Sequence, residues 1–165
     1  MRVGVRPIQK SDEAAFLDAV RRSRALHRSW VSAPANAAAF ARYVNRFAPP
    51  ADFGFVVYAR HSGELVGAIN LTNVVYGLFR SGYLSYFAFA GFERRGHMTQ
   101  ALRSVIRYAF VELKLHRLEA NIQPGNEASL ALVRACGFRK EGFSPAYLKI
   151  AGRWRDHERW AIVRQ

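Results

Sequence analysis

The segment Arg94-Arg95-Gly96-His97-Met98-Thr99 carries the residue types of a phosphate-binding turn. It follows an aromatic run and precedes a stretch with helical apolar spacing. Free amides at a helix N-terminus bind phosphate oxygens, and the helix dipole favours negative charge there. Gly96 allows the backbone to approach a phosphate closely, and the two arginines add positive charge. The Thr99 hydroxyl can cap the helix or bind the phosphate. A plain basic surface turn has the same composition, so the motif alone leaves both interpretations open. It matches neither a Walker loop nor a dinucleotide-binding fingerprint.

A second block lies downstream at residues 115–138. It contains a hydrophobic-His-Arg-hydrophobic-Glu-Ala strand at 115–120, a Pro-x-Asn-x-x-Ser turn at 124–129, and a helix followed by Gly137-Phe138. A third block at 147–162 contains a tyrosine, Gly-Arg-Trp and Asp-His in that order. With these blocks in this order, the chain resembles the GNAT acetyltransferase superfamily, and more narrowly the branch named for N-terminal acetylation of ribosomal proteins. The resemblance covers residues 80–163 well and the first 80 loosely.

The resemblance implies an α/β fold, a single GNAT-type domain over residues 1–165. Its mixed, mostly antiparallel sheet would be splayed at the cofactor site and flanked by helices. The implied reaction is direct acetyl transfer from acetyl-CoA, without a metal, to a primary amine. The expected acceptor is a protein or peptide N-terminal α-amino group, such as that of a ribosomal protein, and a small-molecule amine is the alternative. The expected cofactor-binding residues are Phe87, Ala88, Phe89, Arg94, Arg95, Gly96, His97, Met98, Thr99, Asn126 and Ser129.

Catalytic roles follow from the same resemblance. Main-chain groups at about 87–89 would pair with the pantetheine arm and polarise the thioester carbonyl. In this branch a serine protonates the departing thiolate, and Ser129 occupies its place; the alternative is an ordinary hydroxyl in the first turn of a helix. Glu119 is the favoured general base, and the alternative is an ion pair with Arg117 or another arginine. Asn126 is expected to bind the cofactor or simply to cap its helix. Weaker candidates for the base are Asp156, Glu158 and Glu64.

Two positions depart from the family's phosphate loop. Glu93 stands where the family usually has Gln or Arg, and it places a negative charge near a diphosphate. Met98 stands where a Gly or Ala is usual, and it places a bulky side chain where the backbone packs on the cofactor. Neither change removes the amide donors, but both predict either weaker cofactor binding or a divergent member of the family.

Local patterns predict the elements that position these residues. Residues 2–8 alternate as a strand, and Ser11 is the expected N-cap of one helix that continues to residue 27. A second helix with Phe40, Val44 and Phe47 on one face ends at Pro49-Pro50. Strands flank the turn at 61–64, and 81–90 forms a third strand.

The second half continues with a helix whose apolar face runs from Leu102 to Leu113. A strand at 116–123, a helix from Asn126 to just before Gly137, and two strands joined by a turn at 151–154 complete the chain. The expected order is strand, two helices, three strands, helix, strand, helix, two strands. Residues 27–30 fall where this family receives its acceptor, so they are a candidate substrate rim.

The charge balance restricts the partners. The chain has 25 basic and 12 acidic residues, a net charge of +13 and a pI of about 10.8. Such a field attracts anions and repels polycations. It favours a phosphorylated cofactor, an acidic protein or nucleic acid, and argues against a polyamine or cationic antibiotic. A basic nucleic-acid-binding or regulatory module without transferase activity is the alternative from another class, although no nucleic-acid motif is recognisable and only non-specific binding is expected.

The remaining residues point to no other chemistry. Five scattered histidines lack metal-ligand spacing, and Cys136 is expected to be a small core residue. The single cysteine cannot form an internal disulfide and is compatible with a reducing cytoplasm. No secretory signal or membrane-spanning run is expected, so the predicted location is cytoplasmic and the predicted partners include no membrane. The oligomeric state is left open, with a dimer among the options.

Overall fold

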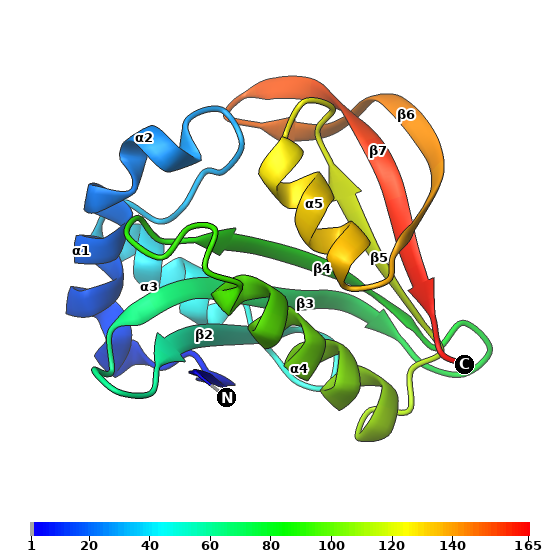
Figure 1. Ribbon diagram of the computed structural model, residues 1–165, viewed down its shortest axis with the longest axis horizontal. Helices are drawn as coiled ribbons and strands as arrows, with labels where there is room; N and C mark the ends of the chain where they lie inside the picture. Colours follow the sequence, from blue (N-terminus) through cyan, green and yellow to red (C-terminus); the bar gives the residue numbers. More distant parts are fainter. Residues whose placement is uncertain (1) are drawn as a thin grey trace.

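The computed structural model describes residues 2–165 as a seven-stranded sheet with helices on both faces (Figure 1). The strand order is β1-β2-β3-β4-β5-β7-β6. The strands are β1 (Val3–Pro7), β2 (Phe53–Ala59), β3 (Leu65–Val75), β4 (Ser81–Ala88), β5 (Arg117–Ile122), β6 (Arg139–Ile150) and β7 (Arg153–Val163). The helices are the 3-10 turn η1 (Lys10–Asp12), α1 (Glu13–Arg22), α2 (Arg24–His27), α3 (Ala37–Asn45), α4 (His97–Val111) and α5 (Glu127–Ala135). The predicted α/β class is confirmed.

The sheet opens between β4 and β5. These strands run parallel, whereas the other neighbouring strands pair antiparallel. Residues 81–83 pair with residues 117–119, and the pairing then stops although β4 continues to Ala88 and β5 to Ile122. The two strands diverge above this point (Figure 1). The predicted splay is therefore present, and it leaves the end of β4 without a strand on one side.

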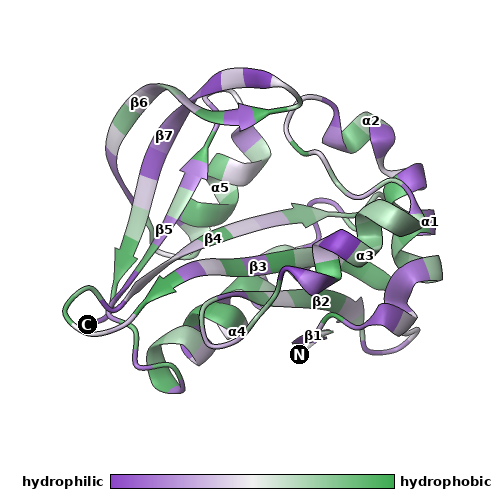
Figure 2. Cartoon of the chain, turned by 180° about the vertical axis from the view of Figure 1, so that it is seen from behind, coloured by the Kyte–Doolittle hydropathy of each residue, from purple (hydrophilic) through white to green (hydrophobic). Residues whose placement is uncertain are grey.

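Two apolar layers hold the helices on the sheet. Under α4 and α5, the fully buried Leu102 and Val133 pack with Leu118 of β5. On the opposite face, Phe16 of α1 and Phe40 of α3 contact each other, with ring centroids 5.2 Å apart. The central strands β2 and β3 are largely hydrophobic, whereas the β6–β7 hairpin carries more hydrophilic residues (Figure 2). The core thus lies at β2 to β5, next to the opening.

The first predicted helix is wrong in two respects. It is two helices, because the chain breaks at Ser23, whose hydroxyl donates to the Ala19 carbonyl at 2.6 Å and accepts the Ala90 amide at 2.9 Å. Ser11 is not the N-cap: the 3-10 turn η1 precedes α1, and Gln9 and Asp12 form a capping box around that turn. The break ties α1 and α2 to the end of β4, since Ala90 follows that strand.

The buried Asp12 forms an ion pair with Arg6, whose side chain is 38% exposed. Its carboxylate accepts both Arg6 guanidinium nitrogens, at 2.6 and 2.9 Å, and the Gln9 amide at 2.8 Å. Burial acts to raise the pKa of Asp12, but the hydrogen bonds from Arg6 and Gln9 and the Arg6 charge outweigh it, so this pKa lies below its ordinary value. A depressed carboxyl pKa stabilises the fold above the unfolded pKa, and this contribution is lost as the pH falls through the folded pKa.

We expect Asp12→Asn to lower the free energy of unfolding by about 1–3 kcal/mol at pH 7, because hydrogen bonds to a charged group are lost. The difference from the unchanged protein should shrink below pH about 4, where the unfolded carboxyl is protonated. Urea unfolding at pH 7 and pH 3 measures both. Asp18→Asn is the control, because Asp18 makes exposed helical pairs with Arg21 and Arg22. A difference that is equal at both pH values would contradict the linkage.

The predicted β2–β3 turn and both predicted ends of α5 are confirmed, whereas α3 ends at Asn45, before Phe47 and the predicted stop at Pro49-Pro50. Gly63, in the β2–β3 turn, and Gly137, just past α5, have φ angles of +77° and +91°. Asn126 accepts a backbone amide as the predicted N-cap of α5, and Asn36, for which no role was predicted, caps α3 in the same way. Within residues 2–165 no helix is long and apolar enough to cross a membrane.

Candidate active site

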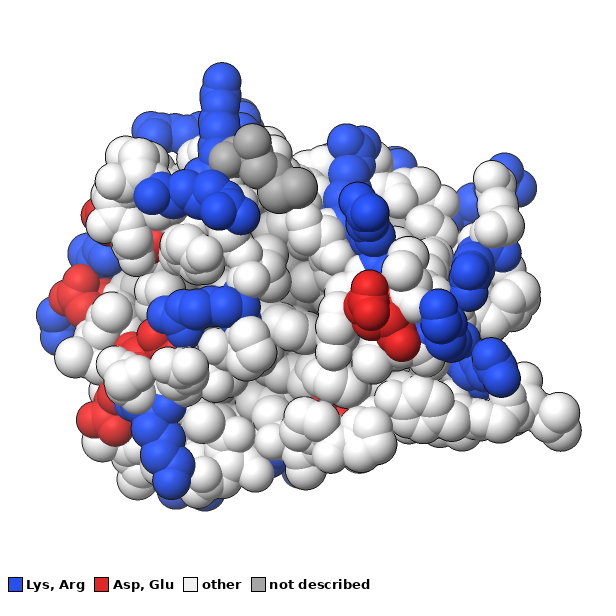
Figure 3. Space-filling view, turned by 90° about the horizontal axis from the view of Figure 1, so that it is seen from below, with Lys and Arg blue, Asp and Glu red and all other residues white. Residues whose placement is uncertain are grey.

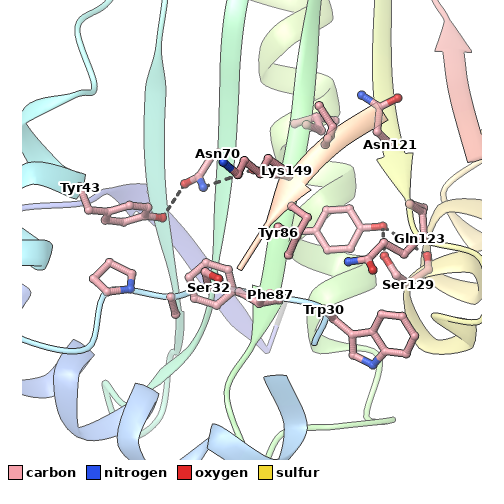
Figure 4. A pocket seen from close by; sticks show the side chains of 18 of the residues that line it. Trp30, Ser32, Tyr43, Asn70, Tyr86, Phe87, Asn121, Gln123, Ser129 and Lys149 are labelled. Atoms are coloured by element: carbon pink, nitrogen blue, oxygen red, sulfur yellow. Dashed lines mark hydrogen bonds between the residues drawn. The ribbon is translucent and has the colours of Figure 1, made fainter. Parts of the chain in front are cut away.

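Two adjoining cavities meet at the opening of the sheet. One, of about 850 Å³, lies between the end of β4, the loop before α4 and α5; we call it the α4–α5 cavity. The other, of about 810 Å³, lies between α3, the loop after α2 and the β6–β7 hairpin; we call it the α3 cavity (Figure 4). A small set of residues lines both, and it marks where their contents would meet. These residues are Trp30, Val31, Tyr86, Phe87, Asn126 and Ser129.

The loop before α4 presents an open helix N-terminus to the α4–α5 cavity. Gly96 is the N-cap with φ +74°, and no side chain caps the helix. No atom lies within 4 Å of the position where a Cβ would stand at Gly96, so the approach is clear. The first intrahelical bond runs from Gln100 N–H to Gly96 O, and the amides of residues 97–99 have no partner within the helix. These groups fit a phosphate.

The two unusual residues of this loop both line the α4–α5 cavity, and each has a partner within the protein. The Glu93 carboxylate accepts the Gly91 amide at 2.8 Å, so its charge is bound within the loop. Met98 packs against β3 at Gly67, where a Cβ would lie 2.7 Å from the Met98 sulfur. The missing side chain at Gly67 therefore provides the room that a bulky residue at position 98 requires. Both departures from the family pattern have local compensation.

The other loop residues divide between the cavity and the surface. Arg94, His97 and Thr99 line the α4–α5 cavity, whereas Arg95 is exposed and lines neither cavity. The His97 ring lies beside Phe92, and its Nδ1 is buried without a hydrogen-bond partner among the described residues. Burial, and then the charges of Arg95 and nearby basic residues, lower the pKa of His97. His97 is thus disposed to be neutral beside the loop.

The main-chain N–H and C=O groups of successive β4 residues point alternately to β3 and to the opening of the sheet. The Phe89 amide donates to the Val66 carbonyl at 2.8 Å, so residues 85, 87 and 89 direct their main-chain groups to β3. The main-chain groups of Phe87 and Phe89, which were predicted to pair with a cofactor, are thus directed to β3. Tyr86 and Ala88 face the opening instead, and the Ala88 carbonyl lies 2.8 Å from Nε2 of His27. Phe89 is buried, and Phe87 lines both cavities with its side chain.

Ser129 and Tyr86 form a hydroxyl pair where the cavities meet (Figure 4). The Ser129 hydroxyl donates to the Tyr86 oxygen at 2.8 Å, and the Tyr86 hydroxyl donates to the Ser129 carbonyl at 3.2 Å. Burial raises the pKa of Tyr86 far above its ordinary value, against a smaller opposing effect of the Ser129 hydrogen bond. Tyr86 therefore remains protonated at physiological pH. Asn126 accepts the Ser129 amide at 3.3 Å, which is the capping role considered above.

Tyr86 was not among the predicted site residues. The alternation of residues along the strand could have indicated Tyr86, because it lies on the same face of β4 as the buried Leu84. A tyrosine on a core-facing row needs a partner for its hydroxyl. The identity of that partner, on α5, is not visible in the strand itself.

Glu119 adopts the alternative role, an ion pair. Its carboxylate accepts Arg117 Nε at 2.7 Å, and the same guanidinium also binds Glu141. Glu119 lines neither cavity, so it does not have the position that a general base requires. The weaker candidates are also displaced from both cavities: Asp156 accepts the Ala146 amide, Glu158 pairs with Lys140, and Glu64 lies at the β2–β3 turn.

Comparisons with known proteins establish the family. Residues 2–139 match the family model described as "Acetyltransferase (GNAT) domain". The chain belongs to the GNAT acetyltransferases. These are acyl-CoA N-acyltransferases, and the predicted family and enzyme class are confirmed. The Bacillus subtilis protein named "Probable N-acetyltransferase YjcK" is 35% identical over 73% of this chain and 67% of its own length. The Escherichia coli (strain K12) enzyme named "[Ribosomal protein uS5]-alanine N-acetyltransferase" is 38% identical over 67% of this chain and 57% of its own length.

Solved structures agree with this GNAT fold. Mycobacterium smegmatis RimJ, in complex with CoA-disulfide, superimposes with a TM-score of 0.89 at 28% identity, over 98% of this chain and 81% of that one. The Vibrio cholerae spermidine N-acetyltransferase, in complex with CoA and spermine, superimposes with a TM-score of 0.82 at 21% identity, over 98% of this chain and 95% of that one. At this identity the likeness shows a common fold and nothing more. Within residues 2–165, no group of three or more His, Cys, Asp or Glu side chains is placed to hold a metal ion.

Proposed function

We propose that this GNAT protein transfers the acetyl group of acetyl-CoA to the α-amino group of a protein or peptide N-terminus, by direct transfer in a ternary complex. The meeting of two cavities at Tyr86 and Ser129 carries this proposal, since it provides one chamber for each substrate. The Escherichia coli relative, named for a ribosomal-protein alanine acceptor, supports a protein acceptor and with it a cytoplasmic location.

The α4–α5 cavity is the proposed CoA site. The open amides of residues 97–99 and the Arg94 side chain would hold phosphate oxygens. The Tyr86 and Ala88 main-chain groups, which face the opening, would pair with the pantetheine arm. When bound, acetyl-CoA supplies an activated acyl group and a thiolate leaving group. On this proposal, the phosphates and the pantetheine arm would bind along the same cavity.

The hydroxyl pair is the proposed proton donor to the thiolate. Tyr86 keeps its proton because burial raises its pKa, and a hydroxyl hydrogen rotates to suit its acceptor. Tyr86 can therefore donate to the Ser129 oxygen while Ser129 donates towards the cofactor. Ser129 is the catalytic residue of this pair and Tyr86 its positioning residue.

The α3 cavity favours an α-amino acceptor. No Asp or Glu is among the described residues that line it, so it offers no carboxylate base. An α-amino group, with a pKa of about 7.7–8.0, is roughly one third neutral at pH 7.5, whereas a lysine amine, near 10.4, is about 0.1% neutral. An α-amine can therefore lose its proton to water or to His157. The Nδ1 of His157 lies 2.9 Å from the Arg155 carbonyl; donation there leaves Nε2 as an acceptor.

Release of CoA from acetyl-CoA tests the proposed function. We expect turnover with peptides that begin with free alanine or serine, and none with the same peptides acetylated at the N-terminus. Free amino acids, amino sugars and polyamines form the second arm. Turnover of these amines without turnover of any peptide would overturn the protein acceptor and favour the small-molecule alternative.

A binding module without transferase activity is tested by thermal stability. The basic side chains spread over the face in Figure 3 keep this alternative relevant. We expect CoA to raise the melting temperature, because it binds the folded state. A rise produced only by RNA or duplex DNA, and lost steeply with salt, would support the module instead.

A further inference from the structure

Three cationic side chains line the α3 cavity, and they carry an inference about the acceptor. Arg42 lies in α3, Arg46 is the C-cap of that helix four residues later, and Lys149 comes from β6. No salt bridge is recorded for any of the three within residues 2–165. The lining includes no Asp or Glu among the described residues. The wall of this cavity is therefore positive without internal neutralisation.

Aromatic rings and hydrogen bonds fix the surroundings of Arg46. The Arg46 guanidinium lies over the Tyr43 and Phe47 rings, at 4.9 and 5.0 Å from their centroids. The Tyr43 hydroxyl donates to Asn70 at 2.7 Å, and the Asn70 amide donates to Ser85 at 3.3 Å, across the floor towards β4 (Figure 4). Stacking holds Arg46 in one orientation without using its hydrogen-bond donors, which stay available for a carboxylate.

The charges lie on a different part of the wall from the hydroxyl pair. Tyr86 and Ser129 lie where the cavities meet, whereas Arg42 and Arg46 lie on α3, and Tyr43 of the same helix is well separated from Ser129 in Figure 4. An amine placed beside Ser129 would thus have the residues that follow it directed towards α3. A carboxylate among those residues would meet the cations, and a lysine there would be repelled.

We propose that the α3 cavity selects acceptors that carry carboxylates in the first few residues after the α-amino group, with Arg42, Arg46 and Lys149 as specificity-determining residues. The proposal rests on the proposed function of this cavity as the acceptor site. It also predicts that a polyamine would bind this cavity poorly, because a polycation would face three positive groups and no carboxylate among the described lining residues.

Three peptides that differ only in charge provide the test. Each begins with serine, followed by Glu-Glu, Gln-Gln or Lys-Lys and then an identical neutral sequence. We expect kcat/KM to fall in the order Glu, Gln, Lys, by roughly tenfold at each step, which is the sum of a few exposed charge pairs. The advantage of the Glu peptide should shrink as salt rises from 50 to 500 mM.

Charge reversal locates the effect. The triple variant Arg42→Glu, Arg46→Glu, Lys149→Glu should invert the order of the peptides. The single variant Lys149→Glu, at an exposed strand position, should reduce the preference for the Glu peptide, and it serves as the test if the triple variant does not fold. The control reverses three exposed arginines that line neither cavity, Arg107, Arg139 and Arg164, and should keep the order.

The outcomes separate the two proposals. Equal turnover of all three peptides, a preference for the Lys peptide, or an order inverted equally by the control would overturn the specificity proposal while leaving N-terminal acetylation in place. Turnover of amino sugars or amino acids with no peptide turned over would overturn the proposed function itself, and the specificity proposal with it.

Discussion

Gly67→Ala is expected to lower the free energy of unfolding by about 1–3 kcal/mol and to weaken CoA binding by roughly tenfold. An added Cβ would lie 2.6 Å from the Phe87 carbonyl oxygen and 2.7 Å from the Met98 sulfur. The first atom belongs to the adjacent strand, and the second to the first turn of α4. The Met98 side chain is flexible, but the Phe87 carbonyl is main chain, so relief requires β3 to shift against β4, whose Tyr86 and Ala88 main-chain groups are proposed to bind the pantetheine arm. Urea unfolding and calorimetric titration with CoA measure the two effects.

Gly142→Ala is the matched control for this change. Gly142 also lies in a strand, but an added Cβ there would meet the end of the flexible Arg159 side chain, which can move. Adding Met98→Ala to Gly67→Ala should restore part of the stability, because the sulfur contact disappears while the Phe87 contact remains. An unfolding curve for Gly67→Ala like that of Gly142→Ala would contradict the inference that β3 and β4 approach too closely at Gly67 to admit a side chain.

Ser129→Ala is expected to reduce kcat about 100-fold with little change in CoA affinity, because a positioned proton donor contributes on the order of 10²–10⁴ to rate. Tyr86→Phe should reduce kcat roughly tenfold, since Ser129 keeps its hydroxyl but loses its partner. The double variant should be no slower than Ser129→Ala, because residues that act as a unit are not additive. Single-turnover rates and CoA titration separate the chemical step from binding.

Tyr83→Phe controls for the loss of a phenol from the same strand. Tyr83 points to the other face of β4 and lines neither cavity, so kcat should be unchanged. Because burial raises the pKa of Tyr86, its ionisation should add no alkaline fall to the rate below pH 9. Full activity of Ser129→Ala, or additive losses in the double variant, would exclude the hydroxyl pair as the proton donor.

The sequence determined those features whose signals lie within a few residues of one another. The apolar face from Leu102 to Leu113 specifies α4, since helical hydrogen bonds join residues four apart. The Asn126 cap and Gly137 end of α5 are set by residues next to the helix they bound. The same holds for the glycine loop before α4. These local segments carried the family resemblance and the order of most elements.

The tertiary structure alone decided the contacts between distant segments. Ser23 ends α1 because its hydroxyl accepts an amide 67 residues away, and Tyr86 finds Ser129 at a separation of 43 residues. The effect of Met98 depends on Gly67, on another strand, and no motif joins the two.

The acceptor chamber shows the same division most clearly. The sequence by itself determined a basic chain with a phosphate-binding helix start, an Asn126–Ser129 turn and the strands and helices of a GNAT fold. It did not determine the acceptor wall, where Arg42 of α3 and Lys149 of β6 line one cavity from positions more than a hundred residues apart. That cavity exists because β4 and β5 part after three paired residues, and strand pairing between distant segments depends on the packing of the whole sheet.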